Sequence, residues 1–143
     1  MLIKQLSIFV ENKPGRLAFI TEVIAEAGID IRAISVADTT DFGILRLIVN
    51  KPDEACEALK AAGLTVTLTS VIAIGVSDKP GGFSVAMRLL ADNDIAVEYM
   101  YAFISRENGK AIVILRVDNE DKARQILSDG GIDTIPSEKI YNM

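Results

Sequence analysis

An internal repeat is the feature that most restricts how this 143-residue chain can fold. Residues 11–17, Glu-Asn-Lys-Pro-Gly-Arg-Leu, align with residues 77–83, Ser-Asp-Lys-Pro-Gly-Gly-Phe. The apolar pattern then continues in register through both halves, with one two-residue insertion in the second half. Aligned pairs include Ile24 with Leu90, Ile29 with Ile95, Ile31 with Val97, Leu45 with Val113 and Leu59 with Leu127. A match of this extent indicates two copies of one structural unit.

Each copy carries the same order of predicted elements. In the first copy, apolar residues from Leu6 to Val10 alternate with polar or mixed residues, as in a half-buried strand. Apolar residues from Leu17 to Ala27 then recur at helical spacing. Gly28 is expected to end this helix, and Asn93-Asp94 to end its counterpart. The elements that follow are a strand from Ile29, a strand over Ile44–Val49, a helix from about Asp53 and a strand over Leu64–Thr69; their counterparts include Ile72–Val76, Ile112–Val117, a helix near Glu120 and a last strand from Ile132.

This order, βαββαβ, predicts an α+β protein made of two ferredoxin-like units. Each unit is expected to be an antiparallel four-stranded sheet with two helices on one face. The expected domains are residues 1–70 and 71–143. No stretch rich in Gly, Ser or Pro separates them near Ser70, so the last strand of one copy runs almost directly into the first strand of the next.

Composition excludes several classes of function. The net charge is −5 and no run of basic residues occurs, which argues against nucleic acid and anionic membranes as partners. There is no His and a single Cys, Cys56, so neither a metal site, a cofactor cluster nor an activated nucleophile is expected. Cys56 aligns with Arg124 and is expected at an exposed helix edge. We therefore expect no catalytic residue and no enzyme activity.

The sequence also indicates where in the cell the protein is expected. The first residues alternate like a strand and do not resemble a signal peptide, and no apolar stretch is long enough to span a membrane. These features predict a cytoplasmic protein.

RNA-recognition modules carry aromatic residues on their third strand, whereas the third strands here, over residues 44–48 and 112–116, contain none.

The Lys-Pro-Gly loops are the candidate ligand sites. Proline forces an extended conformation on the preceding Lys and is tolerated at a helix start, so each helix is expected to begin at or after it. The glycine leaves the backbone of the first turn uncovered, and free amide groups there can meet a carboxylate. Asn12 and Asp78 lie just ahead and can accept hydrogen bonds from loop amides or from a ligand ammonium. The alternative is that both loops serve only to start a helix.

The pattern Asn/Asp-Lys-Pro-Gly-x-Leu/Phe, an apolar helix and then Ala-Gly-Ile-Asp-Ile resembles an ACT domain, and the whole chain resembles a tandem ACT-domain protein. The resemblance implies regulatory binding of amino acids, with a ligand where the loop of one unit faces the second strand of another. Asp30 has Ala96 as its counterpart, so the two sites are expected to be unequal. The ligand-binding residues that it implies are Asn12, Pro14, Gly15, Leu17, Asp30, Ile31, Asp78, Pro80, Gly81, Phe83 and Val97.

Two further surfaces could bear on binding. Tyr99 and Tyr101 have no aromatic counterparts in the first copy, and they either line a ligand pocket or serve as packing surface. If Val97 and Met100 both face the helices, a bulge or twist is expected between them. The open face of the sheets should carry an apolar patch, which favours a homodimer, a higher oligomer or a partner enzyme. The patch is expected to comprise Ile3, Phe9, Ile44, Ile48, Ile112 and Ile114.

Together these features predict a small regulatory or sensor protein that binds an amino acid or similar zwitterion between ACT-like units. The alternative is a ligand-independent interaction module that modulates a partner enzyme.

Overall fold

The computed structural model describes residues 2–38, 41–104 and 109–143. The chain forms two compact units. The first comprises Lys4–Thr69 with Tyr141–Met143, and the second comprises Met1–Ile3 with Ser70–Ile140. They are called the first unit and the second unit below.

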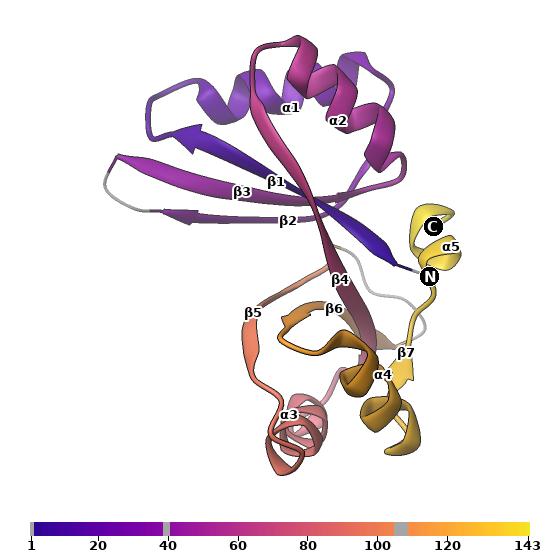
Figure 1. Cartoon of the computed structure of the whole chain (residues 1–143). Coiled ribbons are helices and arrows are strands. Elements are labelled where there is room, and N and C mark those ends of the chain that lie inside the picture. Colours follow the sequence, from indigo (N-terminus) through magenta and orange to yellow (C-terminus); the bar gives the residue numbers. More distant parts are fainter. Residues whose placement is uncertain (1, 39–40, 105–108) are drawn as a thin grey trace. The chain divides into compact units, whose positions relative to one another are not determined.

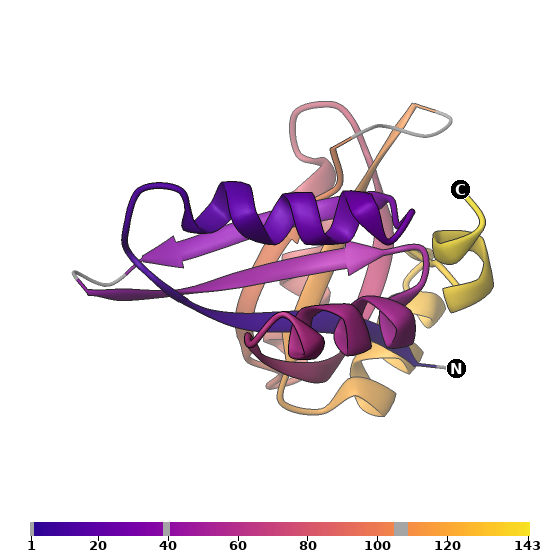
Figure 2. The same cartoon turned by 90° about the horizontal axis from the view of Figure 1, so that it is seen from above.

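The first unit is a four-stranded sheet with the hydrogen-bonded order β2-β3-β1-β4. β3 pairs in antiparallel fashion with both β1 and β2. Both helices cover one face of this sheet (Figures 1 and 2). The elements are β1 (Ile3–Glu11), α1 (Arg16–Glu26), β2 (Ile31–Asp38), β3 (Phe42–Val49), α2 (Pro52–Ala61) and β4 (Thr65–Ser77).

The second unit repeats this order as β5-β6-β4-β7, because the second half of β4 serves as its first strand. Ser70, where one copy was expected to run into the next, lies inside this single strand. The predicted fold class, two βαββαβ units with antiparallel sheets, is thereby confirmed. The remaining elements are α3 (Gly82–Asp92), β5 (Val97–Ala102), β6 (Lys110–Val117), α4 (Glu120–Asp129), β7 (Asp133–Thr134) and α5 (Ser137–Tyr141).

The end of the second unit departs from the repeat. The sequence predicts a full strand from Ile132, but β7 contains only two residues. One further hydrogen bond, donated by the Ile135 amide to the Ala73 carbonyl, extends the pairing. Pro136 has no N–H to donate and stops the ladder, and the short helix α5 follows. None of the helices in the described ranges is long and apolar enough to cross a membrane.

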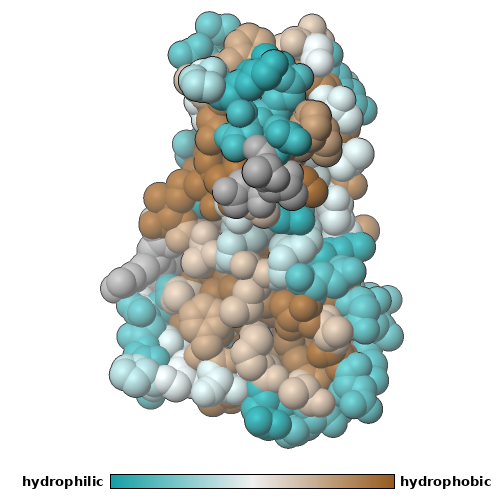
Figure 3. Space-filling view, turned by 90° about the vertical axis from the view of Figure 1, so that its left-hand side faces the viewer, coloured by the Kyte–Doolittle hydropathy of each residue, from teal (hydrophilic) through white to brown (hydrophobic). Residues whose placement is uncertain are grey.

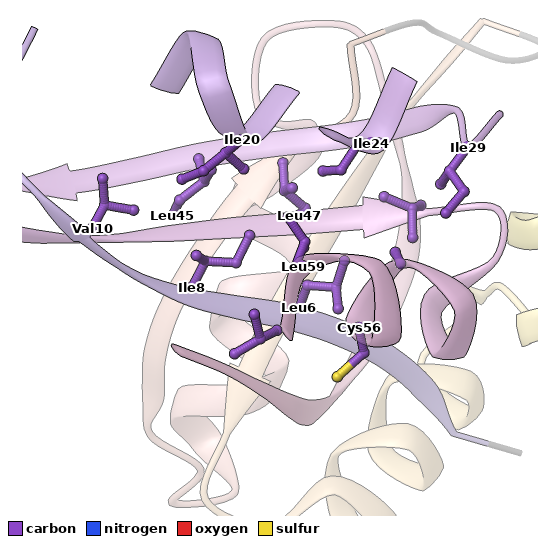
Figure 4. Close-up of a cluster of buried hydrophobic side chains, with 13 residues drawn as sticks. Leu6, Ile8, Val10, Ile20, Ile24, Ile29, Leu45, Leu47, Cys56 and Leu59 are labelled. Carbon is purple, nitrogen blue, oxygen red and sulfur yellow. The ribbon is translucent and has the colours of Figure 1, made fainter. Parts of the chain in front are cut away.

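Each unit has its own core between the sheet and its helices. In the first unit, alternate residues of β1 and β3 meet the inward faces of α1 and α2 (Figure 4). Each fully buried Leu or Ile contributes roughly 1.5–3 kcal/mol relative to an exposed one. Cys56 belongs to this core and is 8% exposed, so the expected helix-edge position is wrong. The first core includes Leu6, Ile8, Ile20, Ile24, Leu45, Leu47 and Leu59; the second includes Ile72, Ile74, Leu90, Val113, Leu115 and Leu127.

The expected apolar patch on the open sheet face is mostly absent. Of its six predicted members, only Phe9 and Ile44 remain exposed, at 51% and 38%. The Phe9 ring stacks on that of Phe42, with 5.0 Å between the ring centroids. Apolar side chains still reach the surface on the face drawn in Figure 3. Burial by the rest of the chain, which strand alternation cannot reveal, removes the other four from solvent: Ile3, Ile48, Ile112 and Ile114.

Candidate functional site

The two Lys-Pro-Gly loops adopt the same backbone conformation. Gly15 has φ 86° and immediately precedes α1, and Gly81 has φ 87° and immediately precedes α3. A positive φ of this size is readily adopted only by glycine. A Cβ built at either position would meet nothing within 4 Å. Conformation, rather than lack of space, therefore requires glycine at both positions.

The first turn of each helix has unused backbone donors. The amide of Arg16 donates to the carbonyl of Lys13 at 3.3 Å, and the amide of Gly82 donates to that of Lys79 at 3.0 Å. Gly15 and Gly81 occupy the N-cap positions and have no side chain with which to cap these helices. Among the described residues, no acceptor lies at the next two amides of either helix, those of residues 17–18 and 83–84. Such amides, together with the helix dipole, favour a carboxylate or another anion.

The charges around the two loops differ. In the first unit, Lys13 Nζ lies 3.0 Å from a Glu11 carboxylate oxygen. The hydrogen bond and the positive charge of Lys13 hold the pKa of Glu11 below its ordinary value. Ser77 takes the place of Glu11 in the second unit, and no carboxylate of the described residues pairs with Lys79. Asp78 stands where the first unit has Asn12, so each loop keeps one carboxylate close to its Lys in sequence.

A cavity lies beside each loop. In the first unit it has a volume of about 180 Å³, and Glu11 and Arg16, on either side of the loop, contribute to its lining. In the second unit it has a volume of about 400 Å³, and Lys79, Pro80 and Gly81 themselves line it. Ligand pockets commonly measure roughly 300–1,000 Å³, so only the second cavity falls in that range.

The structure places the predicted loop residues as follows. Pro80 and Gly81 line the second cavity, and the other predicted residues of the two loops and first turns are exposed without lining either cavity. These other residues are Asn12, Pro14, Gly15, Leu17, Asp78 and Phe83.

The predicted second-strand residues lie elsewhere. Ile31 pairs with Val49 at one end of β3, whereas Glu11, beside the loop, pairs with Phe42 at the other end. Within one unit, the loop and Ile31 at the start of the second strand therefore lie at opposite ends of the sheet. Val97 occupies the same position in the second unit, and like Ile31 it is half-buried against the core of its own unit.

Asp30 is held by the protein itself. Its amide donates to Asn50 Oδ1 at 2.9 Å, and its carbonyl accepts from the Asn50 amide at 3.1 Å. Its exposed carboxylate forms an ion pair with Arg32. A ligand ammonium at Asp30 would therefore have to compete with this guanidinium.

Tyr99 lies on β5, opposite Arg116 of β6, and is half-buried. Its ring stacks on that of Tyr101 at 6.5 Å between centroids. The pairing register shifts between Val97 and Tyr99, which confirms the expected irregularity. Tyr99 does not line either loop cavity.

Three residues that shape the second cavity were not among the predicted site residues: Gly75, Lys110 and Asp133. A signal for them was present in the repeat. Their counterparts are Phe9, Phe42 and Thr65, so these are positions where the two copies differ in chemistry. Throughout the described ranges, no group of three or more Cys, Asp or Glu side chains is arranged to hold a metal ion.

Comparisons with known proteins agree with this architecture. Protein BT0572 from Bacteroides thetaiotaomicron is 38% identical, with a TM-score of 0.93 over 100% of this chain and 98% of that one. The regulatory subunit of aspartate kinase from Thermus thermophilus is 18% identical, with a TM-score of 0.64 over 89% of this chain and 91% of that one. Its counterpart from Thermus flavus is 16% identical, with a TM-score of 0.62 over the same shares. A search of curated proteins gives no match. The family described as the ACT domain pair matches residues 1–143, and the chain belongs to that family.

Proposed function

We propose that this protein is a regulatory sensor that binds an amino acid or a similar small zwitterion at its Lys-Pro-Gly loops. The observation that carries the proposal is the repeated turn in which a left-handed glycine precedes first-turn amides that have no acceptor among the described residues. A carboxylate placed there would receive hydrogen bonds from backbone groups that are already oriented. A backbone site of this kind binds the carboxylate, which is a group that all amino acids share.

The comparisons support a regulatory role rather than a catalytic one. The chain belongs to the ACT domain pair family, and the two Thermus proteins of the same fold are regulatory subunits of aspartate kinase. We extend to this chain the regulatory role that their names describe. Ligand binding would then act on an enzyme carried by another chain.

The proposed mechanism is a shift in association. A ligand can move an equilibrium between two states only as far as it binds one state better than the other. A ligand held at a loop of one chain and at Asp30, which precedes β2, of a second copy would favour the associated state. The exposed rings of Phe9 and Phe42 offer an apolar surface for a second copy or a partner enzyme.

A thermal-shift screen against the common L-amino acids tests the proposal. A ligand that binds only the native state stabilises it by roughly 2.7 kcal/mol at a hundredfold excess over its dissociation constant, which raises the melting temperature measurably. Light scattering with and without the ligand then reports whether association changes. If no amino acid shifts the melting temperature, the sensor proposal fails and a ligand-independent interaction module becomes the better hypothesis.

Matched glycine variants assign the site. Gly15→Val and Gly81→Val would force the loops out of their conformation, whereas Gly28→Val imposes comparable backbone strain after the end of α1. All three glycines have positive φ, and a Cβ added at any of them would meet no atom within 4 Å. Calorimetry should show binding weakened by a loop variant and retained by Gly28→Val. Equal loss in all three variants would contradict a site at the loops.

A further inference from the structure

The loop cavities of the two units are the same cavity, built twice. Eight of the nine residues that line the first-unit cavity have repeat counterparts that line the second-unit cavity. In both units the walls come from the first strand, the start of the first helix, the third strand and the segment after the second helix. Differences between the two cavities therefore reflect side chains at equivalent positions.

The side chains at these equivalent positions make the two cavities differ in size and in charge. In the first unit, the stacked Phe9 and Phe42 rings occupy one wall, and Arg16 lies at the helix start. In the second unit, Gly75 replaces Phe9, Lys110 replaces Phe42, and Gly82 replaces Arg16. Loss of three large side chains accounts for the increase from about 180 to about 400 Å³.

An ion pair stands in the second cavity where the first has an aromatic wall. Lys110 on β6 pairs with the carboxylate of Asp133 on β7. Their side chains are 45% and 59% exposed, so the pair is hydrated and contributes little to stability. Lys79, with no ion pair among the described residues, lines the same cavity.

The charged lining is thus two ammonium groups and one carboxylate, in a chain whose net charge is −5. A ligand with two carboxylates and one ammonium group can pair with every one of these charges. A dicarboxylate without an amine leaves Asp133 facing a like charge, and a basic amino acid places a second cation beside Lys79 and Lys110. Charge matching therefore favours a small molecule with two carboxylates and one ammonium group.

We propose that the second-unit cavity binds an α-amino acid that carries a second carboxylate. Its carboxylates pair with Lys79 and Lys110, and its ammonium group pairs with Asp133, replacing the internal ion pair. The first-unit cavity, narrowed by Phe9 and Phe42, takes no such ligand. This inference rests on the proposed function and names the ligand class and the unit that binds it.

Calorimetric titration of the full chain with L-aspartate and L-glutamate tests the inference, with L-asparagine, L-glutamine and L-lysine as comparison ligands. Loss of a hydrogen-bonded charge partner weakens binding by about tenfold or more, so Lys110→Met and Asp133→Asn should each do so. Lys60→Met, an exposed charge on α2 of the first unit, is the matched control and should change the affinity by less than about twofold.

A second variant fills the cavity without removing a charge. Gly75→Phe installs the residue that the first repeat carries at this position, and a Cβ at Gly75 would lie 3.4 Å from Lys110 Cδ and 3.6 Å from Asp133 Cβ. Binding should be abolished while the circular dichroism spectrum is retained. If this variant does not fold, the two charge variants still decide the question.

The outcomes separate this inference from the proposed function. Tighter binding of aspartate or glutamate than of its amide, with amide chemical-shift changes at residues 79, 81–82, 110 and 131–133, supports the inference. Equal affinity for acid and amide, or affinity unchanged by Lys110→Met and Asp133→Asn, overturns it and leaves an amino-acid sensor with another site. Absence of binding by every common amino acid overturns both.

Discussion

Two adjacent glycines at the start of α3 should respond very differently to one added methyl group. At Gly81 a Cβ meets nothing within 4 Å, and only the positive φ of 87° opposes it. At Gly82 a Cβ would lie 2.0 Å from the carbonyl oxygen and 3.0 Å from the carbonyl carbon of Ser77. The first substitution is therefore a problem of conformation, and the second a problem of space.

The magnitudes follow from these geometries. Left-handed backbone costs a non-glycine residue roughly 1–2 kcal/mol, and the stiffer unfolded chain returns about 0.4–1 kcal/mol, so Gly81→Ala should lower the unfolding free energy by about 1 kcal/mol. Ordinary contacts between non-bonded carbon atoms lie near 3.5 Å, so Gly82→Ala must move backbone by more than about 1 Å. Forced overpacking costs about 1–3 kcal/mol and occasionally more, and we expect at least the upper value because the obstacle is main chain.

Asparagine distinguishes the two causes. Asn tolerates left-handed backbone better than Ala, so Gly81→Asn should recover part of the stability lost in Gly81→Ala. Gly82→Asn should recover none, because its Cβ meets the same carbonyl. Urea unfolding gives the free energies, and residue-resolved hydrogen exchange at Leu90 reports the core of the second unit. A Gly82→Ala protein no less stable than Gly81→Ala would refute this account of the loop.

Three further predictions concern other parts of the fold. Asn119 Oδ1 accepts the Lys122 amide at 3.2 Å at the start of α4, so Asn119→Ala should cost about 1 kcal/mol in urea unfolding, whereas Asn119→Ser should cost less. Leu127 is fully buried in the second core, and Leu127→Ala should cost roughly 2–5 kcal/mol, seen as a lower midpoint of denaturation. Because Lys13 lowers the pKa of Glu11 in the folded state, the pair stabilises the fold above the unfolded-state pKa, and this contribution is lost as pH falls through the folded-state pKa. Carboxyl NMR titration of Lys13→Met should therefore show a higher Glu11 midpoint than in the wild-type protein; an unchanged midpoint would contradict the pairing.

Local patterns in the sequence determined most of the architecture. Alternation with period two marked the strands, and helical spacing marked α1 to α4, because the side chains on one face of an element must be apolar for it to pack. The ends of two helices could also be predicted from nearby residues. Gly28 and Asp94 have φ values of 71° and 56°, in the left-handed region that glycine, asparagine and aspartate adopt more easily than other residues. The repeat then extended each assignment from one copy to the other.

The candidate site required the tertiary structure. Lys110 and Asp133 are 23 residues apart and meet only because β6 and β7 flank the same strand, β4, on either side of Gly75. Alternation likewise could not tell exposed Ile44 from buried Ile48 on the same face of β3, because burial depends on what the rest of the chain covers. Periodicity fixes which way a side chain points along its own strand, whereas cavity size, charge pairing and burial arise between segments that are distant in sequence and are set only when the chain has packed.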